Sequence, residues 1–156
     1  ESHSEMIAAF ERHMSGIACF CHDSYLGAGT LTTAFIRELH RRHYPAGCCE
    51  VPCVPDGEAL RVASDMQALV DDVNTALTGS GSDQHRRDCV ILFGRNLVRI
   101  RPFADANERL ASILVDVLLI RAGMAPIRRE DHAGQNGRAF IASYGSLMAT
   151  SPKALP

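Results

Sequence analysis

The sequence lacks a strong charge of either sign and any long apolar run. Its 156 residues include 16 lysines and arginines against 18 aspartates and glutamates, which gives a formal net charge of −2. Nucleic-acid backbones select basic surfaces, so this balance argues against nucleic acid as the main partner. No apolar run approaches the ~18 residues of a membrane span, and no signal peptide is visible. We therefore expect no membrane span and a cytoplasmic setting, either the producer's own or that of a host.

Internal repeats, linkers and low-complexity tracts are absent as well. A chain of 156 residues with 46% hydrophobic and 22% charged residues is typical of one globular domain with a real core. The sequence opens with Glu1 and not with methionine. We therefore expect residues 1–156 to be a single domain excised from a longer protein.

A familiar zinc pattern is also missing, although the chain has six cysteines. They are Cys19, Cys21, Cys48, Cys49, Cys53 and Cys89. Cys-x-Cys and Cys-Cys are poor chelating pairs for tetrahedral zinc, and a helical core of this size does not need disulfides. We expect buried thiols in a reducing compartment and no zinc. A metal- or redox-responsive module is the least favoured of three functional hypotheses.

Helical periodicity is what the sequence does contain. Apolar residues recur at three- and four-residue spacings over about residues 6–17, 31–39, 66–77, 90–100 and 140–148. Asp83 is the expected N-cap of the fourth of these helices. The other face of that helix carries Arg86, Arg87, Arg95 and Arg99. A further helix, at about residues 107–122, is apolar nearly all round and should end at Gly123, so the predicted fold is an all-α bundle around it.

One stretch, residues 44–58, resists helix because it holds three prolines and two glycines. We expect a short extended flap or hairpin at about residues 47–57. Extended backbone with prolines pairs on one edge only.

A loop of charged and amide residues, "RPFADANER" at residues 101–109, leads into the apolar central helix. A helix N-terminus presents unpaired N–H groups and the positive end of the macrodipole, so phosphates bind there readily. Asn107 and Arg109 could donate to phosphate oxygens, and Asp105 could hold a Mg²⁺ ion that bridges them. Phe103 is expected to anchor the loop in the core. The alternative is an Asp N-cap followed by solvated polar residues.

The same loop resembles the signature of the Fic (Fic/Doc) domain family, His-Pro-Phe-x-(Asp/Glu)-Gly-Asn-Gly-Arg-x-x-Arg. The match holds at Pro102, Phe103, Asp105, Asn107 and Arg109. The segments "TLTTAFIRELHRRHYPAG", "VASDMQALVDDVNTAL" and "ILVDVLLIRAGMAP" are similar to the family's helices before the flap, after the flap and after the motif. The resemblance covers roughly residues 30–148 and rests on the order of the elements as well as on the motif.

The resemblance implies an all-α domain that transfers a nucleotide monophosphate, usually AMP from ATP, to a hydroxyl of a target protein. In this family the motif histidine is the general base, the acidic residue holds Mg²⁺, and the Gly-Asn-Gly turn with its arginine forms an anion hole. Carried over, the cofactors are ATP and Mg²⁺, and Asp105 is the metal ligand. The phosphate-binding residues would be Ala106, Asn107, Glu108 and Arg109. The flap residues that dock the target would be Cys48, Cys49, Glu50 and Val51.

Four motif positions depart from the family's pattern. Arg101 stands in place of the catalytic histidine, and because a guanidinium stays protonated it cannot accept the target's proton. Ala106 and Glu108 replace the two glycines, and the Glu108 carboxylate would repel phosphates or occupy the anion site itself through Arg109. Ser112 replaces the second arginine, which removes a charge that the family uses on the distal phosphates.

These departures favour a catalytically impaired pseudo-enzyme that acts through a protein partner docked at the flap, with residual nucleotide affinity. The alternative is an active transferase that moves AMP or another phosphate-containing group by a non-standard mechanism. Substitute bases, by residue type alone, are His40, His43, His85 and His132. Members of the family serve as bacterial toxins, secreted effectors or housekeeping modifiers, and their inhibitory motif, Ser/Thr-x-x-x-Glu-Gly/Asn, does not occur in this sequence.

Overall fold

The computed structural model describes residues 2–26, 30–43, 56–127 and 140–145, except the side chains of 56–58. The elements are α1 (His3–Cys21), the π-helix η1 (His22–Leu26), α2 (Thr33–His43), α3 (Asp56–Thr78), α4 (Asp83–Ile100) and α5 (Asn107–Arg121). Residues 140–145 are helical as well. The described residues contain no strand, so the predicted all-α fold is confirmed.

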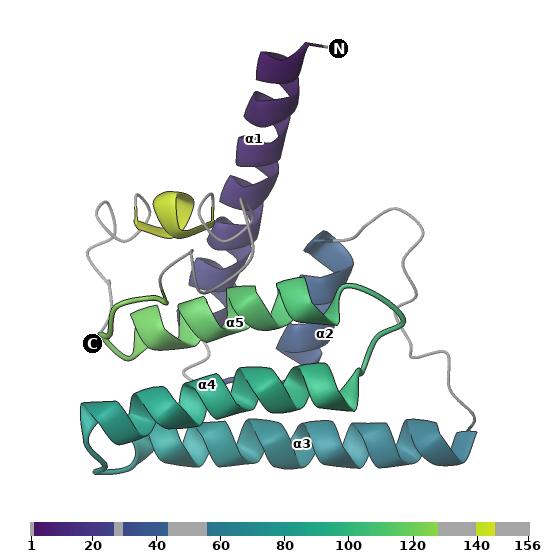
Figure 1. Ribbon diagram of the computed structural model, residues 1–156, viewed down its shortest axis with the longest axis vertical. Helices are drawn as coiled ribbons and strands as arrows, with labels where there is room; N and C mark the ends of the chain where they lie inside the picture. Colours follow the sequence, from purple (N-terminus) through teal and green to yellow (C-terminus); the bar gives the residue numbers. More distant parts are fainter. Residues whose placement is uncertain (1, 27–29, 44–55, 128–139, 146–156) are drawn as a thin grey trace.

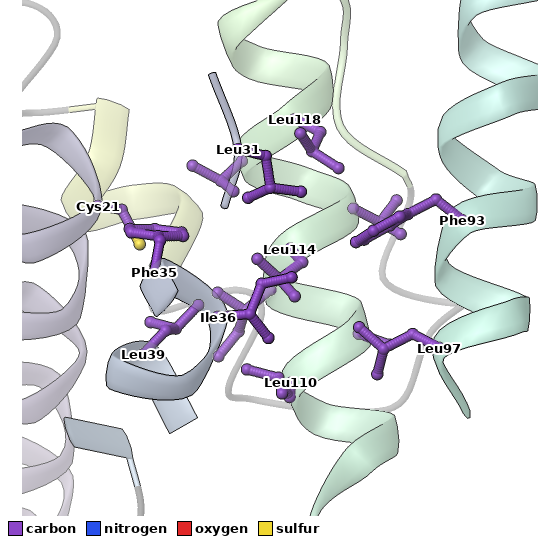
Figure 2. Packing of buried hydrophobic residues seen from close by; sticks show 14 of the residues in the cluster. Cys21, Leu31, Phe35, Ile36, Leu39, Phe93, Leu97, Leu110, Leu114 and Leu118 are labelled. Atoms are coloured by element: carbon purple, nitrogen blue, oxygen red, sulfur yellow. The ribbon is translucent and has the colours of Figure 1, made fainter. Parts of the chain in front are cut away.

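Helix α5 is the centre of the bundle, as its composition predicted. Its apolar residues are buried along nearly the whole length. Figure 2 shows Leu110 and Leu114 of α5 between Ile36 of α2 on one side and Leu97 of α4 on the other. The helix ends before Gly123, whose φ of 78° is the left-handed conformation expected of a glycine after a helix.

Helices α3, α4 and α5 lie side by side, with α4 in contact with both neighbours (Figure 1). Gly94 allows α4 to approach α5 closely, because a Cβ atom there would lie 2.6 Å from Cγ2 of Val115. Such a contact is closer than packed carbon atoms tolerate, so a larger residue at position 94 would push the two helices apart.

Helix α1 extends beyond the rest of the bundle at its N-terminal end (Figure 1). The apolar face predicted for this helix is therefore covered in its second half, where Met14 and Ile17 are buried. In the first half, Met6 is 55% exposed and Ile7 is 42% exposed.

Two predicted boundaries are wrong. The N-cap of α4 is Ser82, whose hydroxyl accepts a hydrogen bond from the His85 N–H, and Asp83 is the first helical residue. Helix α3 begins at Asp56, so residues 56–58 are helical and do not belong to an extended segment. A helix tolerates proline just before or at its start, so the prolines of residues 44–58 do not prevent α3 from beginning at Asp56. Residues 44–55, the rest of the predicted flap, lie outside the described residues.

The cysteines within the described part are not uniformly buried. Cys21 lies in the core and burial raises the pKa of its thiol, whereas Cys19 is exposed and Cys89 is half-buried. The expectation of buried thiols is therefore right for Cys21 and wrong for Cys19. Among the described helices, none is long and apolar enough to cross a membrane.

Candidate phosphate site at the start of α5

The loop between α4 and α5 is held by a buried asparagine. Asn107 is 3% exposed, and its Oδ1 accepts a hydrogen bond from the Phe103 N–H at 3.1 Å. Its Nδ2 donates to the Phe103 carbonyl at 2.9 Å. Both polar ends of this amide thus satisfy backbone groups of the loop. The structure gives Asn107 the task of fixing the loop, and its role as a phosphate donor stays a prediction.

The backbone turns sharply at both ends of this loop. Arg101, at the C-cap of α4, has a φ of 53°, and Ala106, at the N-cap of α5, has a φ of 67°. Both lie in the left-handed region, which is unfavourable for residues with a Cβ atom and favours glycine. The turn at Ala106 therefore has the backbone conformation for which a glycine is best suited.

His40 lies beneath the loop. Its ring stacks on the ring of Phe103 with centroids 3.9 Å apart and planes 4° apart, and its Nε2 donates to the Asp105 carbonyl at 3.1 Å. Phe103 is buried, so its predicted anchoring role is confirmed. His40 was a candidate base by residue type alone, and the structure does bring it to the motif loop. However, it is 1% exposed and fixed by these contacts, so it supports the loop and does not face a substrate.

A pair of histidines, His13 and His43, lies near Arg109. His43 Nδ1 lies 3.1 Å from Nε2 of His13, and the two rings are stacked with centroids 5.2 Å apart. Burial, followed by the electrostatic influence of His13, Arg109 and His40, lowers the pKa of His43 to about 4. His43 is therefore neutral at pH 7, and the surroundings of Arg109 already disfavour another positive charge.

Helix α5 begins without a side-chain cap. Its N-cap is Ala106, and Asp105 Oδ1 accepts from the Ala106 N–H at 2.7 Å. The alternative prediction, in which an aspartate caps the helix, is therefore wrong. By contrast, α1 has a serine cap at Ser2 and α4 has one at Ser82. The N–H groups at the start of α5 are the orphan donors that an anion can satisfy.

A cavity of about 610 Å³ runs between α4 and α5 from this N-terminus. Glu108, Arg109 and Ser112 line it from α5, and Arg87 and Arg95 line it from α4. Glu108 is the one acidic residue among the described lining residues. Occupation of the anion site by Glu108 through Arg109 stays a prediction.

The other predicted site residues lie apart from this cavity or outside the described residues. Arg101 is exposed at the end of α4 and does not line the cavity. His85 is exposed near the opposite end of α4, with its Nε2 3.6 Å from Cys89 Sγ. The flap residues Cys48, Cys49, Glu50 and Val51, and also His132, lie outside the described residues.

Sequence reasoning missed that Arg87 and Arg95 line the same cavity as Arg109 of the motif. Arg87, Ile91 and Arg95 are spaced four residues apart and therefore lie on one face of α4. That spacing was the available signal. It could show that the arginines share a face, but not that this face borders α5.

The exposed Asp105 carboxylate could be one ligand of a Mg²⁺ ion whose other ligands are water and phosphate. Mg²⁺ is usually held by one or two carboxylates together with water and substrate phosphates. Within the described residues, no three histidine, cysteine or acidic side chains are grouped as they would be in an all-protein metal site. Asp105 therefore suits an ion that a phosphate ligand brings with it.

Compared with protein-family models, with curated proteins and with solved structures, the chain matches none.

Proposed function

We propose that this chain is a Fic-like domain with a degenerate active site, a pseudo-enzyme that holds a protein partner and retains a phosphate site. One observation carries the proposal: Arg101 stands where the Fic signature has its general base. Because arginine cannot accept a proton at physiological pH, the step that activates the target hydroxyl has no agent at this position. A lost general base typically lowers the rate by ~10²–10⁴.

Nearby histidines do not replace the missing base. His40 is buried under the loop and donates its Nε2 proton to the Asp105 carbonyl. His43 of α2 is buried, and its Nδ1 lies 3.1 Å from Nε2 of His13 on α1. A general base must reach within about 3 Å of the proton it removes, and buried, engaged rings do not meet that condition.

The phosphate site is the part of the machinery that persists. Its support is the uncapped start of α5, the Arg109 side chain, and a cavity whose described lining residues include three arginines and one carboxylate. Guanidinium groups bind phosphate oxygens in a bidentate manner, so such a lining favours a phosphorylated ligand. Residual binding of Mg²⁺ and ATP, with Asp105 as the protein ligand of the metal, follows from this arrangement.

The first experiment is ATP binding by calorimetry in the presence of Mg²⁺, with the wild type and Arg109→Ala. We expect micromolar binding by the wild type and its loss in the variant. Arg61→Ala is the control, because Arg61 is exposed on α3 and pairs with Asp65 one turn away. Absence of binding to the wild type would remove the nucleotide from the proposal and leave a scaffold for a protein partner.

Partner binding is tested separately through the flap. Replacing residues 48–54 with a glycine-serine segment of equal length should abolish capture of the partner, whereas Asp71→Ala on the exposed face of α3 should not. Capture that survives the flap replacement intact would show that the partner is held elsewhere.

An active transferase is the alternative, and the retained Asp105, whose carboxylate is exposed, together with Arg109 favours it, since Mg²⁺ and one phosphate need these two groups. It predicts transfer of labelled AMP, or of another phosphate-containing group, to protein by the wild type, with loss in Arg109→Ala. The pseudo-enzyme predicts no label from the wild type. Incorporation of label by the wild type would decide for the transferase.

A further inference from the structure

The cavity between α4 and α5 contains positive charge that the motif does not supply. Arg95 and Arg87 reach it from α4, two turns apart on one face of the helix. Arg87 is partly engaged, because its Nη1 donates to the Ala125 carbonyl at 2.6 Å. Arg95 is exposed and forms no hydrogen bond or ion pair with any described residue, so its guanidinium is available to a ligand in the cavity.

The charge of the cavity is one-sided. Among the described residues, three arginines and the carboxylate of Glu108 line it, and the positive end of the α5 dipole lies at the same end as Arg109. In a partly enclosed site the field of such groups adds, so an anionic ligand is strongly preferred over a neutral or cationic one.

The floor of the cavity is apolar. Ile91 and Val98 of α4 and Val115 of α5 line it, together with small residues at Gly94 and Ala111. A Cβ atom at Gly94 would lie 2.6 Å from Cγ2 of Val115, so the two helices approach each other closely along this floor. A volume of about 610 Å³ lies within the ~300–1,000 Å³ of small-molecule sites, which combine apolar walls with a few convergent polar groups.

We propose that Arg95 takes over the role of the missing second arginine. In this arrangement Arg109 and Arg95 bind the phosphates of a nucleotide, and its base lies along the apolar floor toward Arg87. Ser112, which stands where the Fic signature has its second arginine, lines the same cavity, so a charge lost from α5 is supplied from α4. The inference rests on the phosphate site proposed above and adds to it the chemical class and the direction of the ligand.

The test is binding of Mg²⁺–ATP by calorimetry to the wild type, Arg95→Gln, Arg109→Gln and Arg99→Gln. Arg99 is the matched control, because it is exposed on the same helix one turn beyond Arg95 and does not line the cavity. A charge-assisted hydrogen bond to phosphate predicts a loss of about 10–100-fold in affinity for Arg95→Gln. Arg99→Gln should change affinity less than twofold, and all variants should keep the wild-type melting temperature within a few degrees.

Tripolyphosphate tests whether the base of the nucleotide contacts the apolar floor, because it carries the phosphates without the base. We expect ATP to bind at least tenfold more tightly than tripolyphosphate, and Arg95→Gln to weaken both. Equal affinities would overturn the placement of the base on the apolar floor.

The outcomes separate this inference from the proposed function. If Arg109→Gln loses binding and Arg95→Gln behaves like Arg99→Gln, the role of Arg95 is refuted and the phosphate site of the motif is supported. If Arg95→Gln loses binding and Arg109→Gln does not, the groove binds the ligand but the motif does not. If the wild type binds neither probe, the inference is refuted, whereas partner capture through the flap still decides the proposed function.

Discussion

Replacing Asn107 with alanine should destabilise the protein without unfolding it. Two hydrogen bonds join the Asn107 amide to the backbone of Phe103, at 3.1 and 2.9 Å, in a site that is 3% exposed. The substitution leaves a buried N–H and a buried carbonyl without their partners. An unsatisfied buried polar group costs about 1–3 kcal/mol, so we expect a loss of about 2–4 kcal/mol for the pair. A protein of this size should then melt roughly 5–15 °C lower.

A matched control exists elsewhere in the fold. Asn74 of α3 bonds the backbone of Leu31 in the same way, with Oδ1 3.0 Å from the Leu31 N and Nδ2 2.8 Å from the Leu31 O. Asn74 is only half-buried, so water can replace part of what is lost, and Asn74→Ala should cost about 1–2 kcal/mol. This control separates loss of a backbone clamp in general from disturbance of the motif loop.

The assay is urea unfolding followed by circular dichroism, together with ATP binding at a temperature where both variants are folded. Asn107→Ala should lose stability and also weaken ATP binding, because the loop carrying Asp105 and Ala106 is no longer held. Asn74→Ala should lose stability alone. A loss below about 1 kcal/mol for Asn107→Ala would refute the view that this amide holds the loop. Equal effects of the two substitutions on binding would show that the loop does not shape the phosphate site.

Three further predictions concern packing, backbone and pH. Gly94→Ala should destabilise the protein by about 1–2 kcal/mol in urea unfolding. The new Cβ would lie 2.6 Å from Val115 Cγ2, and this overpacking outweighs the gain in helix propensity. A stabilised variant would show that the two helices separate freely. Ala106→Gly should raise stability by about 0.5–1 kcal/mol, because glycine relieves a φ of 67°, and a fall in melting temperature would contradict this. Because the pKa of His43 is lowered to about 4, the unfolded chain binds a proton between pH 6.5 and 4 that the folded chain does not. The stabilisation from neutral His43 is thus complete above pH 6.5 and is lost as the pH falls toward 4. In His43→Gln, the free energy of unfolding measured in urea should depend less on pH over this range. An unchanged pH dependence would refute the lowered pKa of His43.

The central helix illustrates how far sequence patterning reaches. Residues apolar on all sides predict a surrounded helix, and α5, from Asn107 to Arg121, is that helix. Gly123 ended it as expected, because the left-handed conformation selects glycine locally. Local rules were less exact at the starts of helices. The N-cap of α4 is Ser82 and not the predicted Asp83. Serine and aspartate are nearly equivalent N-caps, and the neighbouring residues in the sequence did not distinguish them.

By itself, the sequence determined the all-α class, the central helix and the loop of polar residues at its start, because helical period, glycine preference and motif spacing act over a few neighbouring residues. Only the tertiary structure decided what meets at that loop. The burial of His40 under Phe103 joins α2 to the loop, and the convergence of Arg95 with Arg109 joins α4 to α5. Such meetings depend on how helices pack against one another, and residues distant in the chain carry no local signal of their contact.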